Sequence, residues 1–199
     1  MFYNWEKLYP LLQILKDNIS VMEKELSDND FWIPWPEKNL YENKTYKWDV
    51  IPLLYTFPSY NIKKKKWIKE TCYLFPNTVS LLKNIPNIRT ALFSKMGPET
   101  IIESHTGWGE LSNYVLRCHI PIFIPDKKKC GLSVCGNLKY HNSKEIICFD
   151  DSKIHNAFNF SSKERIVLIV DILRPSCIKK GNASFGKTKE LNNILDLFN

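Results

Sequence analysis

Several features are missing from this sequence, and each absence excludes a class of protein. The 199 residues include only seven glycines and no low-complexity tract, while hydrophobic residues reach 44% and aromatic residues 13%, which excludes collagen-like and disordered chains. No run of about 18 uncharged apolar residues occurs, so we expect no membrane-spanning segment. The amino-terminal segment carries Glu6 and lacks a basic start and a small-residue cleavage site, so we expect no signal peptide.

The cysteines lack the spacing of a metal site or a disulfide framework. None are arranged as CxxC, and their spacings do not fit zinc ligands. We interpret them as buried, reduced thiols because most lie within apolar runs; they are Cys72, Cys118, Cys130, Cys135, Cys148 and Cys177. Reduced thiols and the missing signal peptide together predict a cytoplasmic location.

The chain is basic, with 28 Lys and Arg against 21 Asp and Glu and a net charge of +7. The positive residues concentrate in three runs, Lys63 to Lys66, Lys127 to Lys129, and Lys179 with Lys180. Such runs are typical of solvated loops, and the alternative is a nucleic-acid footprint. We therefore expect no nucleic-acid partner, and we expect a monomer or a weak dimer.

The pattern of elements changes along the chain. Helical spacing of apolar residues predicts one or two helices within 5–27, and shorter helices are expected over 76–84 and 189–198. Prolines exclude a long helix from the aromatic-rich segment 31–57. From Thr90 onward, turn residues separate six β-rich runs, 91–96, 100–104, 114–124, 131–135, 145–149 and 165–173. Strands at this spacing predict an antiparallel sandwich or barrel, not a parallel sheet.

These elements predict one domain, mainly β with a helical amino-terminal cap (α+β). We expect a helical and extended cap over 1–88, a β core over 89–176 and a basic, polar tail over 177–199.

The strand expected over 114–124 has two different faces. Side chains alternate along a strand, so Leu116 and Cys118 belong to an apolar face that must be core, whereas Arg117 and His119 share the opposite face. An arginine beside a histidine can bind a carboxylate, and the alternative is an exposed strand face.

Three of the four histidines lie at or next to the ends of expected strands, as an active site in a barrel mouth requires; the four are His105, His119, His141 and His155. The alternative for each is a hydrogen-bonded structural histidine. Asp150 and Asp151 precede His155 and could form a metal site, orient its ring or cap a turn. Arg165 begins the most apolar strand, where an unpaired cation is costly.

Three separated segments of the sequence give these histidines, acids and arginines one shared interpretation. HTGWGELSNYVLRCHIPIFIP, FDDSKIHNAFN and RIVLIVDILRP together resemble the aspartyl/asparaginyl β-hydroxylase family, and the resemblance is tight from about Ser94 to Pro175. The family consists of Fe(II)- and 2-oxoglutarate-dependent oxygenases on a double-stranded β-helix, a cupin-like jelly-roll barrel. The resemblance therefore implies this fold, with Fe(II), 2-oxoglutarate and O₂ as cofactor and cosubstrates.

The resemblance also implies roles for individual residues. His105 and His155 match the iron ligands, and Gly107 occupies the position where most enzymes of this chemistry have a third, carboxylate ligand. Arg165 matches the arginine that binds the distal carboxylate of 2-oxoglutarate, with Ser94 as its hydroxyl partner.

Four further assignments follow from the same resemblance. Arg117 and His119 match the pair near the metal-chelating carboxylate of 2-oxoglutarate. We interpret Asp150, Asp151 and Ser152 as residues that orient His155, and Trp108 as either a substrate contact or a packing residue. His141 matches no family role, so we assign it to an exposed turn.

The implied reaction is hydroxylation of an unactivated C–H bond, first of all at the β-carbon of Asp or Asn in a peptide or protein. The alternatives are a lipid acyl chain, a free amino acid, or a non-catalytic jelly-roll module that binds an acidic partner or nucleic acid. An acidic peptide requires basic residues around the pocket, whereas an acyl chain requires an apolar channel. Intact His105, His155 and Arg165 argue against the non-catalytic module.

Overall fold

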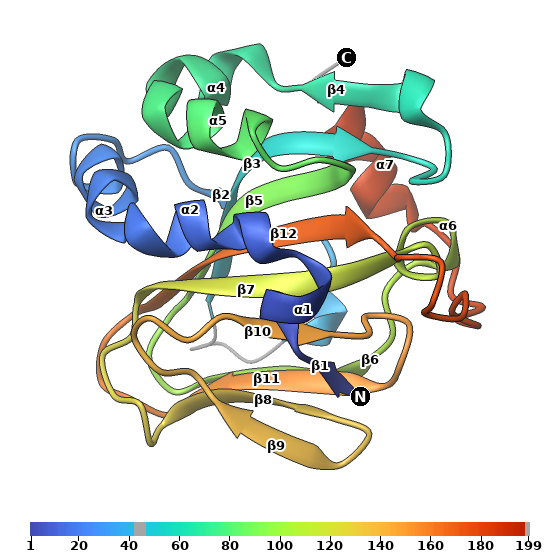
Figure 1. Cartoon of the computed structure of the whole chain (residues 1–199). Coiled ribbons are helices and arrows are strands. Elements are labelled where there is room, and N and C mark those ends of the chain that lie inside the picture. Colours follow the sequence, from blue (N-terminus) through green and yellow to red (C-terminus); the bar gives the residue numbers. More distant parts are fainter. Residues whose placement is uncertain (42–46, 198–199) are drawn as a thin grey trace.

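The computed structural model describes residues 1–41 and 47–197 and contains two antiparallel sheets. The strands are β1 (Phe2–Tyr3), β2 (Ile33–Pro34), β3 (Trp48–Thr56), β4 (Lys65–Trp67), β5 (Ile88–Met96), β6 (Thr100–His105), β7 (Val115–Phe123), β8 (Cys130–Val134), β9 (Asn137–Tyr140), β10 (Ile147–Phe149), β11 (His155–Asn159) and β12 (Arg165–Leu173). The larger sheet has the order β1-β10-β7-β12-β5-β3-β2, with β4 beside β3 (Figure 1). The smaller sheet has the order β6-β11-β8-β9.

The eight strands from β5 to β12 form a double-stranded β-helix. Counted along the chain from β5, the sixth, third, eighth and first strands are neighbours in the larger sheet. The second, seventh, fourth and fifth are neighbours in the smaller one. Apart from the β8–β9 hairpin, successive strands thus alternate between facing sheets, which is the jelly-roll arrangement. The predicted antiparallel barrel is confirmed.

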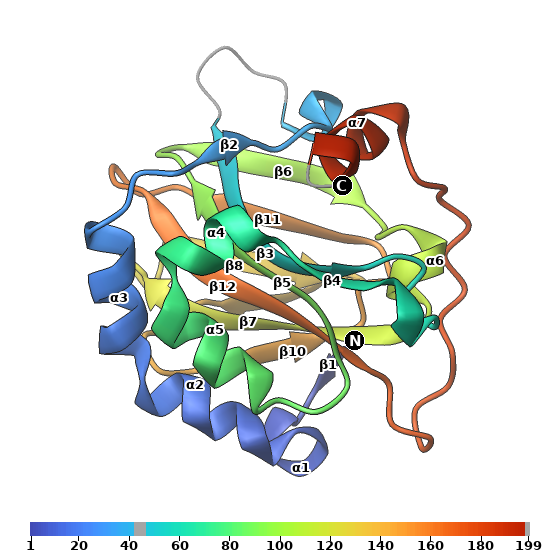
Figure 2. The same cartoon turned by 90° about the horizontal axis from the view of Figure 1, so that it is seen from above.

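Helices cover the outer face of the larger sheet (Figures 1 and 2). The helices are α1 (Trp5–Leu8), α2 (Gln13–Asp17), α3 (Ile19–Ser27), α4 (Lys69–Leu74), α5 (Pro76–Lys83), α6 (Gly109–Ser112) and α7 (Lys189–Leu197), with 3₁₀ turns at Pro10–Leu12, Lys38–Leu40 and Ile62–Lys64. A hydrophobic core lies between α2 to α5 and the sheet, where Leu15, Met22 and Phe75 pack against Phe93. The apolar face predicted for the strand 114–124 lies in this core, with Leu116, Cys118, Ile120 and Ile122 all buried.

A second hydrophobic core lies between the two sheets. It joins Leu132 and Ala157 of the smaller sheet to Leu92, Phe149 and Ile169 of the larger one. The polar side chains of the candidate site, described below, lie in the same space between the two sheets. This layer of the protein therefore serves both packing and chemistry.

Two of the strands from β5 to β12 were not expected from the sequence. The edge strand β9 is exposed and polar, and it follows β8 through a two-residue turn in which Cys135 and Gly136 have φ of 49° and 76°. Positive φ at both positions is typical of a tight hairpin, but the sequence lacks the usual Asn-Gly signal. The strand β11 contains two asparagines and one histidine, so it lacks the apolar pattern from which a strand is predicted.

Several further predictions can be compared with the structure. The helix expected over 189–198 is present as Lys189–Leu197, and residue 198 lies outside the described residues. The segment 31–57 contributes β3, which pairs with β5 in the larger sheet. All six cysteines are free, but Cys135 and Cys177 are exposed, so the expectation of uniformly buried thiols was wrong for these two.

Within residues 1–41 and 47–197, no helix combines the length and apolar character needed to cross a bilayer.

Candidate active site

Two histidines meet at the mouth of the barrel. His105 ends β6 and His155 begins β11, and these two residues are directly paired across the smaller sheet. Their ring centroids are 4.3 Å apart. The register of two adjacent strands, distant in sequence by 50 residues, therefore brings both rings to one point.

The hydrogen bonds of these rings determine which nitrogen is free. His105 Nδ1 lies 2.7 Å from the carbonyl oxygen of Glu103, and His155 Nδ1 lies 2.8 Å from that of Lys153. Because a carbonyl oxygen only accepts, each Nδ1 carries the hydrogen and each Nε2 has a free lone pair. Burial lowers the pKa of both rings to about 4, so both are neutral at pH 7. Two neighbouring neutral imidazoles whose Nε2 lone pairs are free have the form of a pair of metal ligands.

Gly107 has no room for a side chain. A Cβ at this position would lie 1.9 Å from Asp151 Oδ2 and 2.8 Å from Ser112 Cβ. Asp151 occupies the space, with its Oδ1 3.4 Å from Nε2 of His155 and its backbone oxygen accepting from the Gly107 N–H at 2.8 Å. The absence of a carboxylate at position 107 thus has a steric cause, namely the carboxylate of Asp151.

Arg117 lies between two carboxylates. Its Nε and Nη2 donate to the carboxylate of Asp171 at 2.8 and 3.0 Å, and its Nη1 lies 2.6 Å from Asp151 Oδ1. Burial alone would lower the pKa of Arg117, but Asp151 and Asp171 hold it above its usual range. Arg117 therefore orients Asp151 beside His155, and its predicted contact with 2-oxoglutarate stays a prediction.

Arg165 has the opposite surroundings. It is 1% exposed, its Nη2 faces Met96 Sδ, and its Nε and Nη1 have no hydrogen-bond partner among the described residues. Burial lowers its pKa to about 10, so the guanidinium remains charged at pH 7. A buried cation without a carboxylate partner is costly, and such a group fits an anionic ligand.

Ser94 lies close to Arg165 in the register of the larger sheet. On β5 and β12, Arg165 pairs with Met96 and Val167 pairs with Ser94, so both polar residues belong to the face between the sheets. The Ser94 hydroxyl oxygen accepts from Trp48 Nε1 at 3.0 Å, which leaves its hydrogen free to donate.

His119 is paired with a residue that was assigned to the surface. His119 Nδ1 and His141 Nε2 are 3.2 Å apart, and both rings are buried. The expectation that His141 lies in an exposed turn was wrong, because the chain after β9 turns inward and places His141 at 0% exposure. The sequence could not show this, since a histidine among polar neighbours reads as a surface turn.

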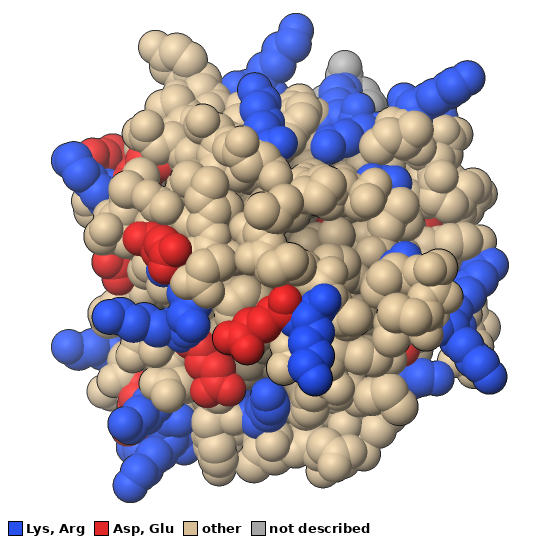
Figure 3. All heavy atoms as spheres, viewed as in Figure 1, with Lys and Arg blue, Asp and Glu red and all other residues tan. Residues whose placement is uncertain are grey.

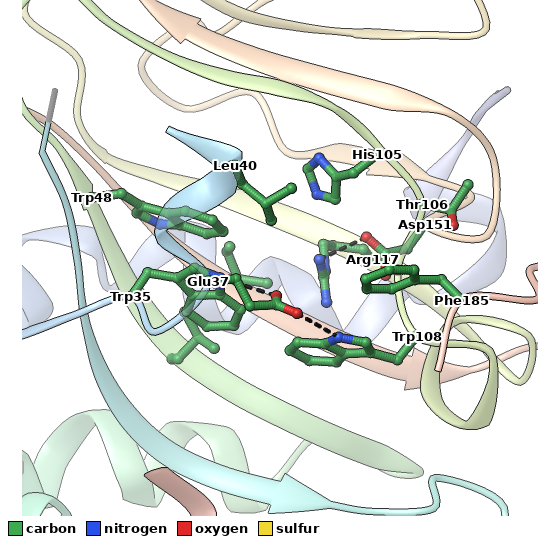
Figure 4. A pocket seen from close by; sticks show the side chains of 13 residues that line it. Trp35, Glu37, Leu40, Trp48, His105, Thr106, Trp108, Arg117, Asp151 and Phe185 are labelled. Atoms are coloured by element: carbon green, nitrogen blue, oxygen red, sulfur yellow. Dashed lines mark hydrogen bonds and ion pairs between the residues drawn. The ribbon is translucent and has the colours of Figure 1, made fainter. Parts of the chain in front are cut away.

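A cavity opens beside His105, the partner of His155 (Figure 4). We call it the histidine cavity; its lining includes His105, Arg117 and Asp151 on one side and Trp35, Glu37 and Trp108 on the other. The Trp35 ring stacks on Trp48 at 4.5 Å and on Trp108 at 5.7 Å between centroids. Glu37, which is 4% exposed, accepts from the indole N–H groups of Trp35 and Trp108 at 3.3 and 3.1 Å. One buried carboxylate thus fixes two of the three stacked indoles.

A second cavity adjoins the first. We call it the apolar cavity, and it shares Trp35, Leu92 and Trp108 with the histidine cavity. The rest of its lining is almost entirely apolar and comes mainly from β3 and the loop that follows it, with single residues from α6, α7 and the start of α4; it includes Val50, Pro52, Leu54, Phe57, Ile68, Leu111 and Leu191. The wall formed by Trp35 and Trp108 therefore separates a polar compartment from a hydrophobic one.

The same residues are matched by a known family. Residues 13–175 match the model of the aspartyl/asparaginyl beta-hydroxylase family, which is more than half of the chain. The chain belongs to this family.

Two relatives show that the names of similar proteins specify different substrates. The chain is 28% identical over 171 residues to "Ornithine lipid ester-linked acyl 2-hydroxylase" of Rhizobium tropici, which covers 85% of this chain and 56% of the relative. It is 30% identical over 112 residues to human "Aspartyl/asparaginyl beta-hydroxylase", covering 54% of this chain and 14% of the relative. The chain thus spans only about half, or less, of the length of these relatives.

A solved structure supports the fold. An oxidoreductase of the 2OG-Fe(II) oxygenase family from Burkholderia pseudomallei superposes with a TM-score of 0.54 at 10% identity, covering 83% of this chain and 82% of that one. At this identity the likeness concerns the double-stranded β-helix alone.

The site of this β-hydroxylase family member fits Fe(II) with two protein ligands. Within the described residues, no three His, Cys, Asp or Glu side chains come together as a metal cluster. His105 and His155 supply two neutral Nε2 donors, and the third position is closed at Gly107 by Asp151. A chelating cosubstrate would have to complete the coordination, and the partnerless Arg165 is suited to bind its far carboxylate.

Sequence reasoning missed three contributors to the site. Asp171 is the bidentate partner of Arg117, and its signal was a single acid within the apolar run RIVLIVDIL. Glu37 and Trp35 form the cavity wall, but their contacts join segments too distant to be read from spacing.

Asp150 does not approach the histidines by any described hydrogen bond; it accepts from Arg174 and from Ser152, and so fixes the turn before β11.

Proposed function

We propose that this protein is an Fe(II)- and 2-oxoglutarate-dependent oxygenase that hydroxylates an aliphatic C–H bond. The single observation that carries the proposal is the coexistence of two neutral, convergent histidines with a buried arginine that has free donors. A purely structural barrel has no use for an unpaired interior cation.

The residues of the chain divide the work. His105 and His155 would hold iron, and Arg165 with Ser94 would hold the distal carboxylate of 2-oxoglutarate. When bound, iron and 2-oxoglutarate supply the activation of O₂ for C–H oxidation. Asp151, held by its ion pair with Arg117, places a carboxylate 3.4 Å from Nε2 of His155. The stacked indoles of Trp35, Trp48 and Trp108 exclude water from one side of the histidine cavity.

The cavities favour an acyl chain over an acidic peptide as substrate. Of the residues lining either cavity, Arg117 is the one basic side chain, and Asp151 and Asp171 already neutralise it. The wall opposite His105 carries an acid, Glu37, which would repel an aspartate. The adjoining apolar cavity has an almost entirely apolar lining, which suits a hydrocarbon chain.

The relatives allow both substrates. The name of the Rhizobium relative specifies an ester-linked acyl group, and that relative is matched over more of this chain than the human peptide hydroxylase. We therefore propose hydroxylation of an acyl chain, and hydroxylation of Asp or Asn in a peptide remains the second candidate. The second candidate is supported by the family itself.

The charge distribution gives little support to a nucleic-acid-binding module. On the face shown in Figure 3, Lys and Arg side chains are scattered, most of them along the edge, and acidic side chains lie among them on the left and in the lower centre. Binding along a phosphate backbone requires a basic stripe or patch.

Succinate release tests the substrate class. The purified protein is incubated with Fe(II), 2-oxoglutarate and O₂ together with either acyl amides and esters of graded chain length or Asp- and Asn-containing peptides. We expect acyl substrates to stimulate succinate release and to gain oxygen in mass spectrometry. We expect Leu191→Asp, which places a charge in the apolar cavity, to raise KM for acyl substrates on the order of tenfold.

The matched control is Leu138→Asp, because Leu138 is half exposed on β9 and lies outside both cavities. Stimulation by peptides alone, with acyl chains inert, would reverse the order of the two candidates. No 2-oxoglutarate turnover with any substrate, in protein shown to contain iron, would contradict the oxygenase proposal.

A further inference from the structure

The two indoles that separate the histidine cavity from the apolar cavity are held to different degrees. The Trp35 backbone donates to the carbonyl oxygen of Trp48 at 2.8 Å and accepts from the Tyr41 hydroxyl at 2.6 Å, and its ring stacks on those of both Trp48 and Trp108. The Trp108 ring stacks on Trp35 alone among the described residues, at 5.7 Å, and its N–H donates to Glu37. The Trp108 side chain is therefore the part of this wall that moves most easily.

Both cavities are small while these indoles are in place. The histidine cavity has a volume of about 40 Å³ and the apolar cavity one of about 70 Å³. By comparison, a cavity of about 150 Å³ binds benzene, so neither cavity alone holds a fatty acyl chain. The residues that line both are Trp35, Leu92 and Trp108, and Leu92 belongs to the central strand β5. Displacement of the Trp108 indole would therefore join the two cavities and add the space that the ring occupies.

Glu37 stabilises the Trp108 indole in this position (Figure 4). The carboxylate is buried, and each of its oxygens accepts from a different indole, Oε2 from Trp35 Nε1 at 3.3 Å and Oε1 from Trp108 Nε1 at 3.1 Å. A chain that displaced the Trp108 ring would break one of these hydrogen bonds and leave a buried carboxylate oxygen without its donor. This cost applies to chains long enough to need both cavities and not to shorter ones.

We propose that Trp108 sets the chain-length selectivity of the site and that Glu37 is the residue that positions its indole. A hydrocarbon chain that extends from one cavity into the other displaces the indole and breaks its bond to Glu37, whereas a shorter chain leaves the indole in place. This inference rests on the proposed function, because it names the feature of an acyl substrate that the site distinguishes.

Binding of uncharged alcohols to the metal-free protein tests the wall without iron, cosubstrate or turnover. Hexanol and decanol differ only in chain length, and isothermal titration calorimetry measures Kd for each. We expect Trp108→Ala to lower Kd for decanol on the order of tenfold and Kd for hexanol by less than about twofold, because only the longer chain extends into both cavities.

Two further variants separate the hydrogen bond from the ring. Trp108→Phe keeps an aromatic ring but removes the N–H, and Glu37→Gln leaves one acceptor oxygen for two indole N–H groups. We expect each variant to lower Kd for decanol about threefold and to leave Kd for hexanol unchanged. Glu110→Gln is the matched control for the lost charge and should change neither Kd, since Glu110 is exposed on α6 and lines neither cavity.

A packing role for Trp108 would give a different pattern. Loss of the indole would then improve the binding of both alcohols equally, and this result would overturn the inference. Unchanged decanol binding in Trp108→Phe and in Glu37→Gln would overturn the role of Glu37. Thermal unfolding establishes that each variant is folded, and if Trp108→Ala is not, Trp108→Phe and Glu37→Gln decide.

Turnover links the wall to the reaction. In succinate-release assays, we expect the ratio of kcat/KM for a decanoyl substrate to that for a hexanoyl substrate to rise on the order of tenfold in Trp108→Ala, and an unchanged ratio would overturn the inference. A wild-type protein that binds the alcohols as expected but turns over no 2-oxoglutarate would instead overturn the proposed function. The two failures are therefore distinguishable.

Discussion

At the scale of single residues, the interior of the barrel contains one cation that is neutralised and one that is not. Arg117 has two carboxylate partners, whereas Arg165, equally enclosed, has two donors without an acceptor among the described residues and a third that faces the Met96 thioether. The difference marks Arg165 as a ligand-binding group, because native proteins rarely leave a buried charge without a partner. Its cost to the ligand-free fold should be measurable.

Replacing Arg165 should separate stability from binding. We expect Arg165→Met to raise the free energy of unfolding of the ligand-free protein by about 1–3 kcal/mol, because an apolar side chain of similar length replaces an unpaired buried cation. The same change should abolish stabilisation by 2-oxoglutarate. Chemical denaturation with and without ligand measures both. Arg165→Lys retains a buried charge and should gain no stability, and a less stable Arg165→Met protein would refute the account.

Gly107 provides a steric prediction. We expect Gly107→Ala to lower the free energy of unfolding by about 1–3 kcal/mol and to weaken Fe(II) binding, because its methyl group would displace Asp151 from its place beside His155. Thermal unfolding and Fe(II) titration measure the two effects. Gly186→Ala is the control, since no atom lies within 4 Å of its Cβ. Equal behaviour of the two variants would contradict the steric explanation of Gly107.

The sequence predicted the site residues unequally, for physical reasons. His105 and His155 occur in recognisable segments at strand ends, and the structure brings them together. His141 was misplaced because its neighbours Tyr140 and Asn142 are those of a surface turn, and only tertiary packing buries it. The partnership of Arg117 with Asp171 depends on strand register, which alternation on a single strand cannot reveal.

At the scale of elements, a carboxylate on α3 connects the helical layer. Glu25 is 8% exposed and accepts from the backbone and side chain of Asn77 and of Thr78, at 2.6 to 3.0 Å. These N–H groups are in the first turn of α5, where helix donors have no intrahelical acceptor. Glu25 therefore caps a helix that is about 50 residues away in sequence.

Loss of this cap should destabilise the protein without changing the site. We expect Glu25→Ala to lower the free energy of unfolding by about 2–3 kcal/mol, since two backbone N–H groups of the first turn of α5, one of them buried, lose a charged acceptor. Urea denaturation measures the loss, and 2-oxoglutarate affinity should be unchanged. Glu23→Ala on the exposed side of the same helix should have little effect. Comparable losses in both variants would show that the cap contributes nothing specific.

The elements that were predicted differ from those that were missed in how they are buried. β5, β7 and β12 are long apolar strands in the centre of the larger sheet, and their composition is enough to predict them. β9 is polar because it is an exposed edge, and β11 is polar because His155 belongs to the site and Asn159 donates to backbone carbonyl groups. Local composition therefore predicts the apolar strands and fails for these two polar ones.

At the scale of the whole molecule, one layer of the fold serves packing alone and the other combines packing with the candidate site. The helices and the outer face of the larger sheet enclose one hydrophobic core, and the space between the sheets holds the histidines, the arginines and the two cavities. The antiparallel barrel could be predicted from strand spacing. Which strands face each other required the pairing of the chain, and so did the apolar cavity, whose lining combines β3 with α7.

The most direct test of the account is an anaerobic titration of the wild-type protein with Fe(II) and 2-oxoglutarate, followed by visible absorbance. We predict a weak metal-to-ligand charge-transfer band that saturates with both additions and is abolished or severely weakened in His155→Ala and in Arg165→Ala. Absence of the band, with iron and 2-oxoglutarate confirmed in excess, would contradict the oxygenase site. The protein would then be a non-catalytic binding module.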